Sequence, residues 1–346
     1  MALNPVSSTV TTHRVDTSDP RVLPGLLVTA VGVVGSLALH EFLQQVGVLT
    51  WSVILGAAAA NLSLLPAAAK PGLRIAMKKF LRVGVVLLGF SLSLVSIIAL
   101  GAPVIALVVV TLLSTLLATT WLGLRMGIGR PRSLLIGTGF AICGASAIAA
   151  MEENAEADDD DVAAAIAMVT ICGTLSMVIL PLLQGPLGLT DTQFGAWAGA
   201  SVHEVGQVVA AASPAGAGAV AVAIVVKLTR VLLLAPVVAG ISVLRRRREE
   251  ASDSESSDRK LPPIVPMFVL GFLVCVVIRS TGLVPAPALE AIGYLQTIAL
   301  SAALFGMGTG VHLASLVRGS SQALMLSAVS TLVVACVSLA GVLWIV

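Results

Sequence analysis

Polar and charged side chains interrupt an otherwise apolar stretch near the middle of the chain. The segment GASVHEVGQVVAA holds His203, Glu204 and Gln207, and the next apolar segment, KLTRVLLLAP, begins at Lys227 and includes Arg230. An ionisable side chain in the centre of a membrane costs at least about 2.5 kcal/mol, so such a residue is usually retained for function. These five residues are therefore our first candidates for a functional site.

The two bases favour a site for an anion. Lys227 and Arg230 are three residues apart, which places both on one face of a helix. Only the connector SPAGAG separates their helix from the one that holds Glu204, so a helical hairpin can bring the charges together. Two cations and one carboxylate leave about one positive charge, which a small anion would neutralise. The alternative is an ion pair that joins two helices and binds no ligand.

The histidine and glutamate also resemble part of a zinc-protease motif, His-Glu-x-x-His. Gln207 stands where that motif has its second histidine, and glutamine is a poor zinc ligand, so we expect no metal. On one helix, His203 and Gln207 share a face and can donate hydrogen bonds to an oxyanion. We expect Glu204 to point elsewhere, either holding Lys227 or Arg230 in place or carrying a coupling proton.

Two glycine-rich segments predict interrupted helices. TGFAICGASAIAAM contains Gly144 and Ser146, and LFGMGTGVHLASL contains Gly308, Thr309 and His312. Each glycine lowers helix stability by about 1 kcal/mol relative to alanine. A break exposes backbone amides, and the half-helix that starts there directs a partial positive charge at a ligand. The alternative is close helix packing through small residues, which membrane helices favour.

The composition requires a membrane protein. Of 346 residues, 57% are hydrophobic and 11% are charged, and the mean hydropathy is +1.03. A spanning helix needs roughly 20 apolar residues, and the apolar runs lack the alternation of barrel strands. The sequence therefore predicts an all-α polytopic protein with about eleven spans, at 23–40, 50–66, 72–97, 102–122, 131–151, 161–182, 191–212, 217–244, 263–280, 287–316 and 321–345.

The basic residues predict the orientation, because short cytoplasmic loops are enriched in Lys and Arg. With a cytoplasmic N-terminus, the inner loops hold nearly all of them, and the acidic run EENAEADDDD falls outside, as does the C-terminus. We expect residues 1–22 to form a cytoplasmic tail and residues 23–346 to form one transporter domain. A cytoplasmic linker is expected within that domain at about 245–262.

Internal similarity suggests an inverted repeat. ILGAAAANLSLLP followed by LRVGVVLLGFSLSLVS resembles VLGFLVCVVIRSTGLVP followed by LSAALFGMGTGVHLAS. Seven predicted crossings separate the two copies, so their orientations in the membrane are opposite. Inverted repeats are typical of secondary transporters.

Five segments, taken in order, resemble one known family. LRVGVVLLGFSLSL, FAICGASAIAA, SVHEVGQVVAA, KLTRVLLLAP and FGMGTGVHL are similar to the YeiH-like family of bacterial inner-membrane proteins, which carry the label of sulfate exporters. The resemblance implies a multi-pass plasma-membrane transporter related to the cation/proton antiporter and anion transporter superfamily, with inverted repeats and unwound, crossing helices. It does not settle the substrate. A homodimer is expected only by analogy.

We therefore expect a secondary transporter that moves a small anion, such as sulfate or a sulfonate-like oxyanion, by alternating access around a site at the membrane midplane. Lys227 and Arg230 would neutralise the anion. His203, Gln207 and backbone amides near Gly144 and Gly308 would donate hydrogen bonds to it. Ser146, Thr309, His312 and Glu204 complete the predicted site.

Two other functions fit the same residues. One is a sodium- or proton-coupled importer of an organic anion, and the other is a channel or a structural membrane component. An enzyme is not expected, because no spacing pairs a nucleophile such as Ser146 with a base such as His203. The expected partners are the lipid bilayer, the anion and a coupling proton or sodium ion, without a cofactor or nucleic acid.

Overall fold

The computed structural model describes residues 22–44, 47–251, 266–310 and 321–345, and within these ranges every regular element is helical, as predicted. Six of the described helices are long and apolar enough to cross a membrane. The α-helices are α1 (Leu23–Phe42), α2 (Val48–Asn61), α3 (Lys70–Ile75), α4 (Leu81–Leu88), α5 (Leu94–Ala99), α6 (Gly101–Arg125), α7 (Arg130–Ala141), α8 (Ala145–Ala155), α9 (Asp159–Gln184), α10 (Asp191–Ser201), α11 (Val205–Ala212), α12 (Ala217–Leu232), α13 (Leu234–Ala251), α14 (Met267–Ser280), α15 (Ala286–Gly308) and α17 (Ser321–Ile345). Four short turns join them: η1 (Ala67–Ala69), η2 (Ala76–Phe80, π-helical), η3 (Gly89–Ser91) and η4 (Ser213–Ala215).

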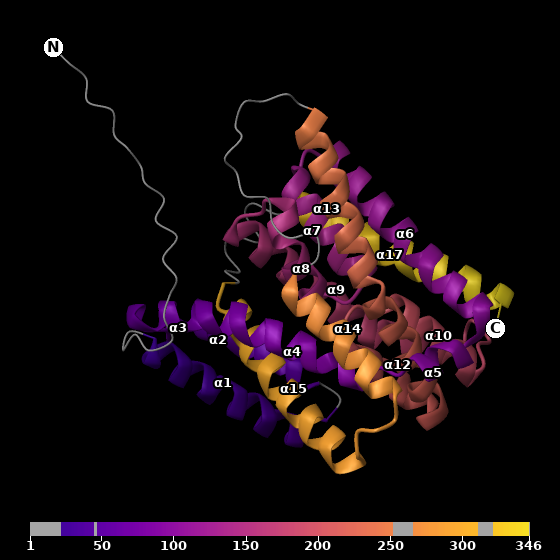
Figure 1. Cartoon of the computed structure of the whole chain (residues 1–346), viewed down its shortest axis with the longest axis horizontal. Coiled ribbons are helices and arrows are strands. Elements are labelled where there is room, and N and C mark those ends of the chain that lie inside the picture. The colour runs from indigo at the N-terminus through magenta and orange to yellow at the C-terminus, as the bar shows by residue number, and fades with distance from the viewer. Residues whose placement is uncertain (1–21, 45–46, 252–265, 311–320, 346) are drawn as a thin grey trace.

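The described helices form two groups. The first, which we call the panel, consists of α1 to α4 with α14 and α15; the second, the core, consists of α6 to α13 with α17. Figure 1 shows α15 beside the indigo α1 and the purple α4, the orange α14 beside α4, and the yellow α17 beside α6. Segments that are far apart in the sequence therefore complete both groups.

Small residues hold the panel together. A side chain at Gly25 would overlap the backbone of α3 at Gly72, and one at Gly56 would overlap the end of α15 at Phe305 and Gly308. Such close backbone approach is a common way for membrane helices to associate. Within LFGMGTGVHLASL, α15 runs without a break up to Gly308 and ends there, and the predicted interruption beyond residue 310 lies outside the described residues.

The segment 131–151 does not cross the molecule as predicted. Its helix is interrupted at 142–144, where Gly144 has a φ of +73°, and each half is too short to span roughly 30 Å. Arg132 at the start of α7 contacts Asp161 at the start of α9, with 2.7 Å between Nε and Oδ1. Helices α7 and α8 therefore enter and leave on one face, as a re-entrant hairpin.

The segment 191–212 forms a second re-entrant hairpin. Helix α10 packs along α12, with Gly195 against Ala219 and Gly199 against Ala223, so the two helices run in parallel. Helix α12 must then begin at the face where α10 begins, and α11 returns the chain to that face. The second hairpin enters from the face opposite to the first. Two of the eleven predicted crossings are therefore hairpins. The prediction counted them as spans because hydropathy alone does not distinguish a span from a pair of half-helices.

The first hairpin changes the position of the acidic run. Residues of this run make ion pairs with Arg74, Lys78, Arg82, Arg132 and Arg245, so acids and bases share one face, which we call the charged face. The prediction that the acidic run lies opposite the basic loops is wrong, because α8 brings the chain back before the run begins. Which face is cytoplasmic stays a prediction.

The predicted boundaries fall partly outside the described residues. Helix α13 extends to Ala251, so the first residues of the expected linker are helical, and the rest of that linker is not described. The tail before Val22 also lies outside the described residues. Helices α2 and α4 run antiparallel to their proposed counterparts α14 and α15, but equivalence of the two copies stays a prediction.

Candidate functional site

The tips of the two hairpins meet at the side chain of Lys227, which lies on α12. Its Nζ donates hydrogen bonds to the carbonyl of Ile142 at 2.7 Å and to the carbonyl of Val202 at 2.9 Å. The first acceptor follows α7 and the second follows α10. One buried ammonium group therefore joins two half-helix ends that enter from opposite faces.

Arg230, one helical turn further along α12, completes this connection. Its guanidinium donates to the carbonyls of Phe140 and Ala141 at the end of α7, and to the carbonyl of Ala200 at the end of α10, over 2.5 to 3.0 Å. A helix C-terminus carries unsatisfied carbonyls and a partial negative charge. Lys227 and Arg230, which are fully buried, therefore neutralise two such ends at once.

Glu204 is the last residue of the break between α10 and α11, and it directly precedes α11. Its side chain is 6% exposed, and among the described residues Oε1 has no hydrogen-bond partner. The expected pairing with Lys227 or Arg230 is not formed: ion pairs between described residues include none of the three. The carboxyl instead lies beside Gly144 of the first hairpin, whose positive φ and lack of a side chain admit it.

His203 and Gln207 do not share a helix face. His203 lies in the break, with its ring edge-on to Phe140 at 4.5 Å between centroids, and among the described residues neither ring nitrogen has a partner. The Oε1 of Gln207 accepts the backbone N–H of Glu204 at 3.3 Å, and its amide packs against Gly173 of α9. Both side chains therefore lie within the core and brace the second hairpin.

A cavity of about 350 Å³ separates the hairpin tips from the panel. Residues from the first turns of α8 and α11 line it, together with Ser146 and Glu204 from the predicted site. Its core side consists of Cys143, Ala145, Ser146, Glu204, Val205, Gly206, Val209, Ala210 and Ser213, and its panel side of His40, Gln44, Gly47, Val48, Leu49, Leu81, Leu88, Gln296, Thr297, Leu300 and Leu304. Exposed Gln44 and Ser213 form its rim, so the cavity opens away from the charged face.

The other predicted site residues lie elsewhere. Lys227, Arg230, His203, Gln207 and Gly144 surround the hairpin tips without lining the cavity. Gly308 packs against α2, and Thr309 ends α15 with its hydroxyl bonded to Gly306 at 2.6 Å. His312 lies outside the described residues. The structure thus brings Glu204, Gly144 and Ser146 together, and does not bring Gly308 or Thr309 to them.

The sequence analysis missed the polar side chains that the panel contributes. Gln296 and Thr297 face the cavity from α15, and His40 and Gln44 face it from the end of α1. Gln296 accepts the hydroxyl of Ser91 at its Oε1, over 2.9 Å, so its amide nitrogen keeps two donors. Gln296 satisfies the criterion that identified Glu204, a polar group within an apolar span, and could have been found by it.

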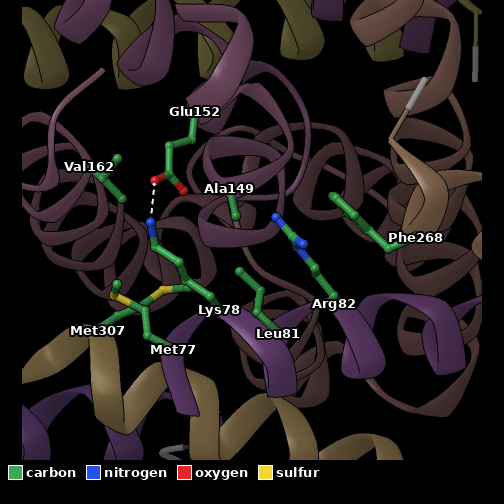
Figure 2. Close-up of a pocket in the computed structure, with 9 residues that line it drawn as sticks. All are labelled: Met77, Lys78, Leu81, Arg82, Ala149, Glu152, Val162, Phe268 and Met307. Atoms are coloured by element: carbon green, nitrogen blue, oxygen red, sulfur yellow. Dashed lines mark hydrogen bonds and ion pairs between the residues drawn. The ribbon is translucent and has the colours of Figure 1, made fainter. Parts of the chain in front are cut away.

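A much smaller pocket, about 20 Å³, lies between panel and core at the charged face. Figure 2 shows Lys78 pointing across it toward Glu152, with 3.0 Å between Nζ and Oε1. Leu81, which is 4% exposed, lines both this pocket and the large cavity. No other described residue lines both, so the two cavities meet only at Leu81.

These features define a multi-pass helical membrane protein with an internal cavity at two hairpin tips. The chain matches the family model described as Conserved hypothetical protein 698 over residues 24–327, and it belongs to this YeiH-like family, as its motifs predicted. No solved structure matches it.

Relatives from distant bacteria share nearly the whole chain. A UPF0324 membrane protein of Corynebacterium glutamicum is 42% identical over 92% of both chains. Others are UPF0324 membrane proteins of Agrobacterium fabrum, 31% identical over 89% of both chains, and of Bradyrhizobium diazoefficiens, 33% identical over 86% of both. Their names agree with a membrane location and state no activity.

Proposed function

We propose that this protein is a secondary transporter that moves a small anion, of the sulfate or sulfonate class, across the membrane by alternating access. One observation carries the proposal: two half-helices that belong to hairpins from opposite faces direct their first turns into one cavity, whose exposed rim residues Gln44 and Ser213 lie away from the charged face. A carrier needs such a site, whereas a continuous pore would not end at a buried Leu81.

The positive ends of two helices favour an anion. The first backbone amides of α8 and α11 have no partner within their helices, and the aligned peptide dipoles place partial positive charge there. Ala145, Ser146, Val205 and Gly206 bring these turns to the cavity wall. The hydroxyl of Ser146, which contacts Cys143 in this structure, would turn to donate to a bound anion. An oxyanion at this place would accept hydrogen bonds from both hairpins at once.

Lys227 and Arg230 act on the anion indirectly in this proposal. Their hydrogen bonds hold the negative ends of α7 and α10 behind the tips, so the positive ends of α8 and α11 remain available for the ligand. While Glu204 is ionised, the three side chains together leave about one positive charge near the site, and protonation of Glu204 raises it. This role replaces direct contact between these bases and the substrate.

Glu204 is proposed to carry the coupling proton. Its carboxyl lines the cavity at the start of α11, where an ionised carboxylate would repel the substrate and is costly to bury, since its Oε1 has no hydrogen-bond partner among the described residues. A proton and an anion therefore bind there together more readily than either binds alone. A sodium-coupled importer of an organic anion is the rival, and anion flux under imposed sodium or proton gradients separates the two.

Filling the cavity tests the site. A side chain added at Gly206, the second residue of α11, would meet no atom within 4 Å and would project from the cavity wall. We expect sulfate or methanesulfonate to raise the Tm of the detergent-solubilised protein, and Gly206→Leu to abolish that shift.

Gly218→Leu is the matched control for this test. Gly218 is the second residue of α12, equally unobstructed, and does not line the cavity. The control is expected to retain the anion-dependent shift. An undiminished shift in Gly206→Leu, measured by thermal unfolding in the same detergent, would place anion binding elsewhere.

A further inference from the structure

Ion pairs join panel and core at the charged face. Arg74 contacts Asp159 at 3.1 Å, Lys78 contacts Glu152 at 3.0 Å and Asp159 at 3.9 Å, and Arg82 contacts Glu153 at 3.3 Å. All three bases belong to the panel segment 67–88, and all three acids belong to the end of α8 or the start of α9. We call these six residues the clasp.

The clasp is distinct from the other ion pairs of the charged face. Arg132 with Asp161 and Arg245 with Glu156 connect elements within the core, whereas each clasp pair connects panel to core. The bases recur every four residues, so they lie along one side of their helical segment. One row of three cations therefore faces three acids, two from α8 and one from α9, across the junction.

The clasp lies where the large cavity ends. Leu81, the last cavity residue on this side, is flanked in sequence by Lys78 and Arg82, and both line the small pocket together with Glu152 (Figure 2). The helix carrying Lys78 is π-helical over Ala76–Phe80, an irregularity often found at functional sites. A path from the cavity to the charged face would have to pass between these paired side chains.

We infer that the clasp is the gate at the charged face: closed here, while the cavity is open to the other face, and broken when panel and core separate to release the substrate. The inference rests on the proposed alternating access. The clasp side chains are between 23% and 74% exposed, so each pair is weak. Several weak pairs acting together hold a gate shut and still let it open.

Charge reversal tests the gate without using any substrate. In a background in which the four cysteines are replaced by serine, Ala149→Cys places a thiol in the small pocket behind Lys78. A membrane-impermeant maleimide, applied to vesicles of each orientation, measures its access from the charged face. We expect Lys78→Glu to raise the labelling rate roughly tenfold, because repulsion from two acids replaces attraction.

A double variant with exchanged charges and a variant of a neighbouring lysine give the controls. Lys78→Glu combined with Glu152→Lys is expected to restore most of the slow labelling. Lys79→Glu should leave the rate unchanged, since Lys79 is exposed in the same turn and has no ion pair with a described residue. Size-exclusion profiles matching the parent establish that each variant is folded, and Arg82→Glu with and without Glu153→Arg repeats the test at a second pair.

If Lys78→Glu and Arg82→Glu are both labelled at the rate of the parent, the clasp is not a gate. The same conclusion follows if Lys78→Glu combined with Glu152→Lys is labelled as fast as Lys78→Glu alone. Neither result bears on anion binding. Conversely, faster labelling that the swap reverses, in a protein that neither binds nor moves any anion tested, would support the gate and contradict the proposed substrate class.

Discussion

At the residue scale, Lys227 and Arg230 contact the backbone carbonyls of two half-helix ends. Sequence patterns placed them near the middle of the membrane but could not reveal their partners, because the acceptors are backbone carbonyls that any residue supplies. The same limit applies to Glu204, whose neighbour is a glycine rather than a base. The buried ionisable residues could be identified from the sequence. Whether each of them contacts a ligand or another part of the protein could not.

Replacing either base should therefore reduce stability first. Lys227→Met removes two charge-assisted hydrogen bonds, so we expect a loss of about 3 kcal/mol, and Arg230→Met should cost more because it removes four. Denaturant or thermal unfolding in detergent measures the loss, with the exposed Lys79→Met as control. Parent-like stability combined with lost sulfate binding would show that these bases contact the anion directly.

At the element scale, the hairpins are the features that sequence analysis recognised only in part. The break near Gly144 was predictable from glycine content, but re-entry was not, since hydropathy is the same for a crossing helix and for two half-helices. At Gly308 the missing side chain allows close contact with α2, and α15 ends at this residue, so an interruption of the following segment stays a prediction.

The turn of the first hairpin gives a prediction at this scale. Gly144→Ala places a side chain where φ is +73° and puts its Cβ only 2.9 Å from Cγ of Glu204. Gly188→Ala, with a φ of +65° and no atom within 4 Å of the added Cβ, carries the backbone strain alone. We expect about 1 kcal/mol of destabilisation for Gly188→Ala, and a larger loss together with weakened sulfate binding for Gly144→Ala. Equal effects of the two variants, measured by thermal unfolding with and without sulfate, would contradict the contact.

At the scale of the whole molecule, panel and core enclose a cavity that no single segment of sequence contains. Its panel wall comes from α1, α2, α4 and α15, and the described residues predicted for the site in this region, Gly308 and Thr309, are not those that line it, whereas Gln296 and Thr297 do. The all-helical membrane class and the family followed from the sequence. The charged face, from which the cavity opens away, is recognised by ion pairs between segments that are far apart in the sequence. Such pairs cannot be read from the sequence.

The most direct test of the central claim is uptake of radiolabelled sulfate into proteoliposomes under a proton gradient. We expect saturable uptake by the parent and by Gly218→Leu, and uptake at the level of protein-free liposomes for Gly206→Leu, whose side chain occupies the cavity at the start of α11. Uptake by Gly206→Leu equal to that of the parent would contradict the assignment of this cavity as the transport site.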